Sequence, residues 1–389
     1  MKTFPLNSRA KTTALKQPKE LFAYARDGDG NFVYDEEKVR EEHMSYYYLP
    51  DATINGNVDL GAGYQNFKKI PEEENLGDFA AFLTAIMKYE QVSNTKVKTD
   101  IITFRGLMTK LLTLPYNLKD PIDLNVVAFD GQLFIKADDQ IELNRRKLQN
   151  EQHQNDKKKE EFQRKCEFSG YKFETIATLP KPWADSSRSM IQKRSKKVVT
   201  NYEQYMSVVR TGIGKVKVLL AGEVDCLWDY IPEDGKDILP HYAELKTSRV
   251  LEHPGQIINF EKKLFKTWAQ SFLLGIRKVV YGFRDDNLIL RTVEVYSTEE
   301  IPLLLKNDPF TEEKQKIVPM NALKWYGAVL EWLTTEIPSE DVGAWRLSYD
   351  PGSRSFSLSE IMDGKRVRDD IISPEFREWR ASLNQKTEN

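Results

Sequence analysis

The sequence predicts a mixed α/β (α+β) fold, in which helices flank a core of mixed, twisted β-sheets. Apolar runs bounded by turn residues predict four strands in one part of the chain, over residues 216–226, 241–247, 278–283 and 287–296. Apolar side chains recur at helical spacing after Pro254, at Phe260, Leu264, Trp268 and Phe272. The order is therefore strand, strand, helix, strand, with the fourth strand pairing with the third, which favours a sheet with a covering helix.

Further helices are predicted from apolar spacing, over residues 78–89, 100–114, 322–336 and 374–383. The second has Asp100 as a candidate N-cap and stops at Pro115, because a proline cannot continue a helix. Asp130 and Gly131 separate two apolar runs within 124–136. This dipeptide favours the tight turn between antiparallel strands, so we expect a β-hairpin there.

The composition limits the classes of function. The net charge is −2, so nucleic-acid binding would depend on a local basic patch and not on a global field. Two cysteines, Cys166 and Cys226, predict no disulfide framework and fit a reducing compartment. No run reaches the roughly 20 apolar residues of a spanning helix, and the N-terminus lacks the apolar segment of a signal peptide, so no membrane association is expected.

Two short acidic runs carry the strongest chemical signal. Glu223 and Asp225 stand two positions apart in one predicted strand, and Glu244 and Lys246 do so in the next. Residues at i and i+2 project from the same face of a strand, so each pair should point together. Three carboxylates on one patch are costly to bury unless a divalent cation lies between them. A solvent-facing charged strand would explain either pair alone, but their succession favours a metal site.

The two runs resemble the centre of the PD-(D/E)xK nucleases. In that superfamily, an Asp on one core strand and Glu-x-Lys on the next bind the metal ions, which places Asp225, Glu244 and Lys246 in these roles. The resemblance implies a nuclease-like core at about residues 168–297.

Further motifs are similar to those of the DXO family of RNA 5′-end decapping and pyrophosphohydrolase enzymes. They occur in family order over roughly residues 45–300, at 103–106, 170–174, 207–210, 268–272 and 281–284. Details near the N-terminus resemble the fungal nuclear branch of this family, whose members partner the nuclear 5′-to-3′ exoribonuclease. The resemblance thus implies a nuclear RNA-processing enzyme that has this exoribonuclease as a partner.

The resemblance assigns site residues by position. The implied metal ligands are Glu174, Glu223, Asp225, Glu244 and the main-chain carbonyl of Leu245. The implied catalytic residues are Glu223, Asp225, Glu244, Lys246 and Gln270. The implied RNA-binding residues are Arg105, Met206, Arg210, Glu223, Lys246, Gln270 and Arg284. The cofactor would be Mg²⁺ or Mn²⁺, with two ions in the active complex.

The implied activity is hydrolysis of incompletely processed RNA 5′ ends. Substrates would carry a 5′ triphosphate, an unmethylated guanosine cap or an NAD cap, and the product would be 5′-monophosphate RNA; no DNA substrate is expected. Two alternatives stay open: a distributive 5′-to-3′ exoribonuclease that uses the same metals, and a non-catalytic subunit that stabilises the exoribonuclease.

Two surface features receive weaker predictions. Trp183 lies in a proline-stiffened segment and is a candidate anchor for the exoribonuclease, although burial is the usual fate of tryptophan. The basic run over 193–197 could be a nuclear-import signal, part of an RNA groove or a solvated helix face.

In domain terms, we expect an extended, partly ordered lead-in over residues 1–45 and a single catalytic domain over 46–389. Within the domain, residues 138–164 are highly charged and predict a solvated helix or a mobile insertion.

Overall fold

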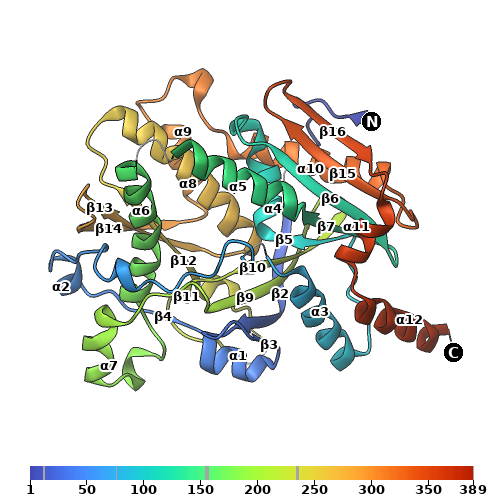
Figure 1. The fold of residues 1–389 in the computed structure, drawn as a ribbon. Helices are drawn as coiled ribbons and strands as arrows, with labels where there is room; N and C mark the ends of the chain where they lie inside the picture. Colours follow the sequence, from blue (N-terminus) through green and yellow to red (C-terminus); the bar gives the residue numbers. More distant parts are fainter. Residues whose placement is uncertain (12–13, 76, 154–156, 234–235, 389) are drawn as a thin grey trace.

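The computed structural model describes residues 1–389 apart from 12–13, 76, 154–156, 234–235 and 389. Figure 1 shows two β-sheets with helices packed around them. Each sheet contains both parallel and antiparallel strand pairs, so the prediction of a mixed α+β fold is confirmed. No helix in the described ranges combines the length and apolar character needed to cross a bilayer.

The larger sheet has ten strands in the described residues. In spatial order they are β1 (Lys2–Thr3), β16 (Ser355–Glu360), β15 (Ala344–Asp350), β6 (Ile122–Phe129), β7 (Gln132–Ala137), β5 (Ile101–Phe104), β10 (Val216–Glu223), β9 (Gln204–Ile213), β2 (Leu15–Arg26) and β3 (Phe32–Val33). Strand β5 runs parallel to both of its neighbours, and the other pairs are antiparallel. The predicted hairpin is confirmed: β6 pairs with β7, and both turn residues have positive φ, 47° at Asp130 and 74° at Gly131.

The smaller sheet has six strands in the described residues. Their order is β14 (Leu290–Ser297), β13 (Lys278–Arg284), β12 (Tyr242–Arg249), β11 (Cys226–Leu227), β4 (Tyr46–Tyr47) and β8 (Thr178–Leu179). Helix α8 (Pro254–Leu274) connects the parallel strands β12 and β13, as the sequence predicted. Its apolar residues pack into the main core, where Phe260 contacts the ring of Tyr281 edge-on.

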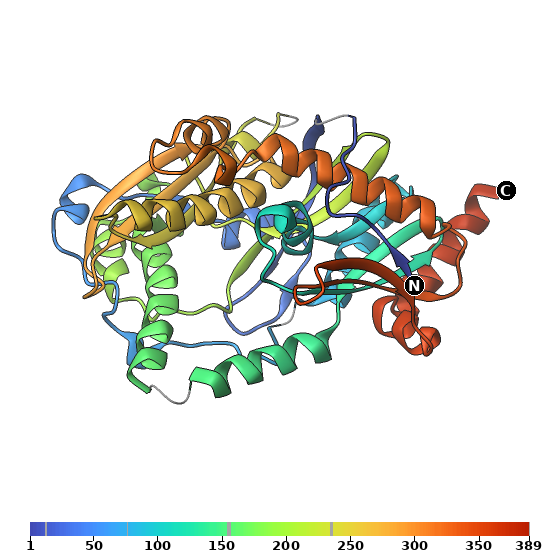
Figure 2. The ribbon, with the colours of Figure 1, turned by 90° about the horizontal axis from the view of Figure 1, so that it is seen from above.

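The other helices surround the two sheets. They are α1 (Glu36–His43), α2 (Asp51–Ile54), α3 (Phe79–Ser93), α4 (Arg105–Thr113), α5 (Asp139–His153), α6 (Lys157–Ala177), α7 (Arg188–Lys193), α9 (Ile301–Asn307), α10 (Pro319–Glu336), α11 (Gly364–Ile371) and α12 (Pro374–Glu388). Single 3-10 turns lie at Tyr64–Asn66, Leu114–Tyr116, Trp183–Asp185, Arg194–Lys196, Leu239–His241 and Glu313–Gln315. Figure 2 shows α8 and α10 along one side of the molecule and α5 along the opposite side, with α6 running between the two sides. Within the charged segment 138–164, residues 139–153 and 157–164 are helical.

One strand prediction was wrong at the acidic run. The strand expected over 216–226 is divided, because β10 ends at Glu223 in the larger sheet and β11 begins at Cys226 in the smaller one. Glu223 and Asp225 therefore do not project from one face of a single strand. The apolar pattern is continuous across the break, since both strands are buried, so periodicity alone could not reveal the change of sheet.

The predicted start of the second helix was also wrong. Residues Ile101–Phe104 form strand β5, and the helix begins at Arg105. Asp100 caps no helix; its carboxylate accepts a hydrogen bond from the Lys217 main-chain N–H at 2.6 Å. The β-branched pair Ile101-Ile102 is fully buried between β7 and β10, and this tertiary pairing overrides the helical spacing.

The N-terminal segment differs from the expected lead-in. Strand β2 pairs with β9 along its length, and its residues 22–25 are buried in the core. Helix α1 follows, with Asp35 as its N-cap. The polar composition of residues 1–45 suggested partial order, but the consecutive apolar residues 22–25 enter two core clusters, one on each face of the sheet.

Candidate active site

Four acidic residues, from three elements and one connecting segment, meet between the two sheets. Glu223 ends β10, Asp225 lies in the connection to β11, Glu244 lies in β12 and Glu174 in α6. The Glu244 side chain is 1% exposed and that of Asp225 is 9% exposed. Glu174, Glu223 and Asp225 line the same cavity, and burial with the charges of Asp225 and Glu223 raises the pKa of Glu174 well above its usual value. We call these four residues the acidic cluster.

Two cations are bound to the acidic cluster. Arg105 donates from Nη1 to Glu244 Oε2 at 3.1 Å, and Lys246 donates from Nζ to Glu244 Oε1 at 2.5 Å. Lys246 Nζ also lies 3.9 Å from Asp225 Oδ2. Burial alone would raise the pKa of Glu244, but the charges of Arg105 and Lys246 lower it to about 2. Glu244 therefore stays ionised.

The negative charges of Asp225 and Glu223 are less well balanced by positive groups than that of Glu244. The Leu245 main-chain N–H donates to Asp225 Oδ2 at 2.6 Å, yet burial and the charge of Glu244 raise the pKa of Asp225 to about 7. Glu223 accepts a hydrogen bond from Gln204 Nε2 at 3.2 Å, and burial raises its pKa too. Four carboxylates thus share two ion-paired cations, which leaves an excess of negative charge when all are ionised.

This donor set fits a hard divalent cation. All four side chains offer carboxylate oxygens, the ligands that Mg²⁺ and Mn²⁺ prefer. The excess negative charge would be offset by such an ion. Among the described residues, however, no three Asp, Glu, His or Cys side chains are arranged as a formed metal site. Arg105 and Lys246 occupy the oxygens of Glu244, and the Leu245 amide occupies one of Asp225, so metal binding requires these side chains to rearrange.

A glycine beside the cluster allows close packing. A Cβ atom on Gly222 would lie 2.7 Å from Leu274 Cδ1 and 3.0 Å from the Cβ and Cδ atoms of Arg105. Only glycine at this position lets α4 and α8 approach the end of β10. The sequence around Gly222 therefore places Arg105 against the acidic cluster.

Helix α8 borders the cluster with polar side chains. Thr267 and Tyr281 share a hydrogen bond of 2.7 Å, and Tyr281 is paired in register with Lys246 in the neighbouring strand. Gln270 lies about one turn after Thr267 and is half-buried. The Thr267–Tyr281 contact places this part of α8 next to the strand that carries Lys246, and the role of Gln270 stays a prediction.

A family model described as RAI1 like PD-(D/E)XK nuclease matches residues 16–377 of the chain. The chain belongs to this family. The resemblance to PD-(D/E)xK nucleases and to RNA 5′-end decapping enzymes is thereby confirmed, and so is the prediction of a nuclease.

Similar proteins share the whole length of this RAI1-like chain. A protein of Debaryomyces hansenii named decapping nuclease RAI1 is 68% identical over all of both chains. The crystal structure of Candida albicans Rai1 in complex with pU5 and Mn²⁺ is 56% identical, with a TM-score of 0.96 over 98% of this chain and 99% of that one. Scheffersomyces stipitis Rai1 in complex with (3′-NADP)⁺ and calcium ion is 62% identical, with a TM-score of 0.93 over 98% and 100%.

The structure of this RAI1-like nuclease brings some predicted RNA-binding residues to the cluster but not others. Arg105 contacts Glu244, and Met206 is paired in register with Glu223. Arg210 is exposed four residues further along β9, and Arg284 ends β13 opposite Arg249. In the described part of the chain, no hydrogen bond or ion pair joins Arg210 or Arg284 to the acidic cluster. Their roles stay predictions.

A cavity of about 510 Å³ opens beside the acidic cluster. Glu174, Glu223 and Asp225 line one part of it, and the basic run contributes Lys193, Arg194 and Lys197. A second group of lining residues lies outside the motifs identified in the sequence: His43, Gln204 and Tyr205. Tyr171 also lines it, and burial with the charges of Glu174 and Glu223 raises its pKa to about 12. Tyr171 lies inside the 170–174 motif, which is the signal that could have identified it.

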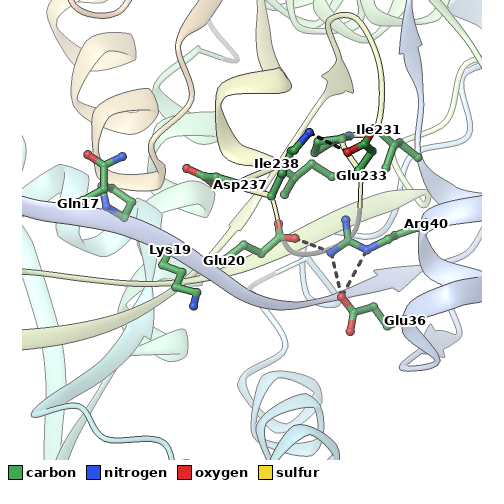
Figure 3. Close-up of a pocket in the computed structure, with 12 residues that line it drawn as sticks. Gln17, Lys19, Glu20, Glu36, Arg40, Ile231, Glu233, Asp237 and Ile238 are labelled. Carbon is green, nitrogen blue, oxygen red and sulfur yellow. Dashed lines mark hydrogen bonds and ion pairs between the residues drawn. The ribbon is translucent and has the colours of Figure 1, made fainter.

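A larger cavity of about 630 Å³ lies away from the cluster, between β2, α1 and the segment before β12 (Figure 3). Its buried acid, Glu20, accepts hydrogen bonds from Arg40 at 2.8 Å, Ser207 at 2.5 Å and Tyr242 at 2.8 Å. Burial raises the pKa of Glu20, and these partners oppose that shift. The Glu20 carboxylate therefore has hydrogen-bond and ion-pair partners within the protein, unlike the acidic cluster with its excess negative charge. Because these bonds connect β2, β9 and β12, the group has a structural role.

Proposed function

We propose that this chain is a divalent-metal-dependent hydrolase of RNA 5′ ends. The buried acidic cluster carries the proposal, because four carboxylates with only two bound cations suit a phosphate-cleaving metal centre. Relatives named decapping nucleases match the chain over its full length, and the similar C. albicans structure contains pU5 and Mn²⁺. Both support an RNA substrate and a divalent cofactor.

The proposed substrates are RNAs with a 5′ triphosphate, an unmethylated guanosine cap or an NAD cap. The S. stipitis Rai1 complex with (3′-NADP)⁺ supports the last of these. Hydrolysis would leave a 5′-monophosphate RNA, which a 5′-to-3′ exonuclease can then degrade. The cluster could also serve a distributive 5′-to-3′ exoribonuclease, and the pU5 complex of the C. albicans protein keeps this second candidate in view.

The proposed metal ligands are the acidic cluster and the Leu245 carbonyl, holding two Mg²⁺ or Mn²⁺ ions. When bound, such ions activate a water molecule and stabilise charge on the leaving oxygen. Lys246 would release Glu244 and donate instead to the scissile phosphate or the attacking water. Gln270 would orient the same group from α8. The Arg105 guanidinium would stay beside the acidic cluster and donate hydrogen bonds to a substrate phosphate. Met206 would contact the RNA nearby, and Arg210 and Arg284 would contact it further along the strand.

A nuclear exoribonuclease partner and nuclear localisation complete the proposal. The Trp183 side chain supports a partner surface, because it is 63% exposed, which is unusual for tryptophan. A Trp183→Ala variant should fold normally and lose binding to the exoribonuclease in a pull-down. Retained binding at wild-type affinity would remove Trp183 from the interface.

The activity is tested with 5′-triphosphate RNA and Mg²⁺ or Mn²⁺. We expect pyrophosphate release from the wild type and a loss of at least a hundredfold in Glu174→Gln. Glu167→Gln is the matched control, because Glu167 lies two turns earlier on the same helix and is exposed. Shortening of 5′-monophosphate RNA would support the exoribonuclease, and inertness toward every 5′ end would leave a non-catalytic stabilising subunit.

A further inference from the structure

The basic run over 193–197 is attached to the helix that carries Glu174. Arg194 donates from Nε to the Ile176 carbonyl at 2.9 Å and from Nη1 to the Ile191 carbonyl at 2.6 Å. Lys172 donates from Nζ to the Ser195 carbonyl at 2.6 Å. Ile176 and Lys172 both belong to α6, so these bonds fix the run at a set position relative to the acidic cluster. This anchoring argues against a freely solvated helix face.

Two lysines of the run remain available to a ligand. Lys193 and Lys197 line the 510 Å³ cavity together with Glu174, Glu223 and Asp225. In the described part of the chain, the Lys193 ammonium forms no ion pair. Lys197 lies 3.3 Å from Glu203, and both side chains of this pair are more than half exposed, so water screens their interaction. Arg194, by contrast, uses its donors on main-chain carbonyls.

The cavity is therefore lined both by carboxylates of the acidic cluster and by the ammonium groups of Lys193 and Lys197, with Glu42 and Glu203 also in its lining. If the 5′ phosphates of an RNA entered this cavity, one phosphate would lie at the metal-binding carboxylates, and the next would lie beside the two lysine ammonium groups. Arg105, Lys246 and Gln270 approach the cluster from α4, β12 and α8, and are absent from the residues that line this cavity. The body of the RNA would lie on their side, and the cavity would receive the 5′-terminal group. Its volume falls within the roughly 300–1,000 Å³ of small-ligand sites.

We propose that Lys193 and Lys197 bind the 5′-terminal phosphates of the substrate and set the preference for phosphorylated ends. This inference rests on the proposed function, since it assigns the leaving group of that reaction to the cavity. It gives the basic run a substrate-binding role, whereas an import signal would need no fixed position beside the cluster.

The test compares the Lys193→Gln/Lys197→Gln double variant with Lys196→Gln. Lys196 belongs to the same run and is exposed, but it does not line the cavity. We expect KM for pyrophosphate release from 5′-triphosphate RNA to rise about tenfold in the double variant, because each lost charge-assisted hydrogen bond weakens binding. In the control, KM should stay within about twofold, as expected for an exposed charge. Restoring the charge with Lys193→Arg/Lys197→Arg should recover most of the affinity.

Binding to RNAs of one sequence with different 5′ ends identifies the phosphate that is recognised. In an Asp225→Asn background, which keeps the RNA intact, the double variant should lose affinity for 5′-triphosphate RNA and keep its affinity for 5′-hydroxyl RNA. Equal losses for both RNAs would overturn the inference, because they would show contact with the RNA backbone. No loss for either would overturn it too. If the wild type hydrolyses no 5′ end at all, the proposed function itself fails. That result differs from the two binding results that would overturn the inference alone.

Discussion

At the scale of single residues, the contact between Arg105 and Glu244 dominates the site. Their side chains are 10% and 1% exposed, and without Arg105 the buried Glu244 would keep Lys246 as its one ion-pair partner among the described residues. Arg105→Ala should therefore lower the free energy of unfolding by about 3–5 kcal/mol in metal-free protein. Chemical denaturation with EDTA measures this loss. The exposed Arg210→Ala is the control and should change stability by no more than about 0.5 kcal/mol.

Adding a divalent metal should reduce the cost of Arg105→Ala, because an ion would replace the missing positive charge. An equal loss of stability with and without metal would contradict the placement of the metal beside Glu244.

Asp225 predicts a pH dependence at the same scale. Its pKa is 3.8 in the unfolded reference and about 7 in the folded protein, so the folded state holds the proton more tightly. Raising the pH through this window removes that proton and lowers the stability of the metal-free protein. Asp225→Asn cannot lose a proton there, so its stability relative to the wild type should increase between pH 4 and 7. Thermal melts at several pH values with EDTA measure the difference, and a constant difference would contradict it.

At the scale of elements, Gly222 controls how closely α4 and α8 approach β10. Gly222→Ala should lower stability by about 1–3 kcal/mol, because the new methyl group would overlap Leu274 and Arg105. Activity on 5′-triphosphate RNA should fall further than stability alone explains, since Arg105 would be displaced. Gly106→Ala is a suitable comparison: a Cβ there meets nothing within 4 Å, and alanine in the helix should stabilise the protein by about 0.5–1 kcal/mol. Equal effects of the two substitutions would refute this role of Gly222.

At the scale of the whole molecule, N-terminal strands form both edges of the larger sheet. Strand β1 pairs with β16 at one end, and β2 and β3 form the other. Deleting residues 1–26 would expose the long strand β9 and part of the core. The truncated protein should aggregate or lose its cooperative thermal transition, measured by gel filtration and circular dichroism. A monomeric, cooperatively folded truncation would restore the idea of a dispensable lead-in.

The local features of this protein can be predicted from its sequence alone. Turn and helix preferences depend on residues that are close together in the sequence, so sequence patterns predict them directly. The Asp130-Gly131 turn and helix α8 are examples, and the acidic residues of the two short runs were also recognised from their spacing. Motif order also indicated the family before any contact was known. The break between Glu223 and Asp225 was missed, because a strand that changes sheets keeps its apolar pattern.

Which side chains meet at the site depends on the packing of elements that are distant in the sequence. Glu174 reaches Asp225 across 51 positions of sequence, and Arg105 reaches Glu244 across 139. Lys193 and Lys197 gain a place beside the acidic cluster through hydrogen bonds to α6, which no spacing in the sequence encodes. Such meetings follow from the packing of distant elements, and the shifted pKa of Asp225 arises from the burial that this packing produces.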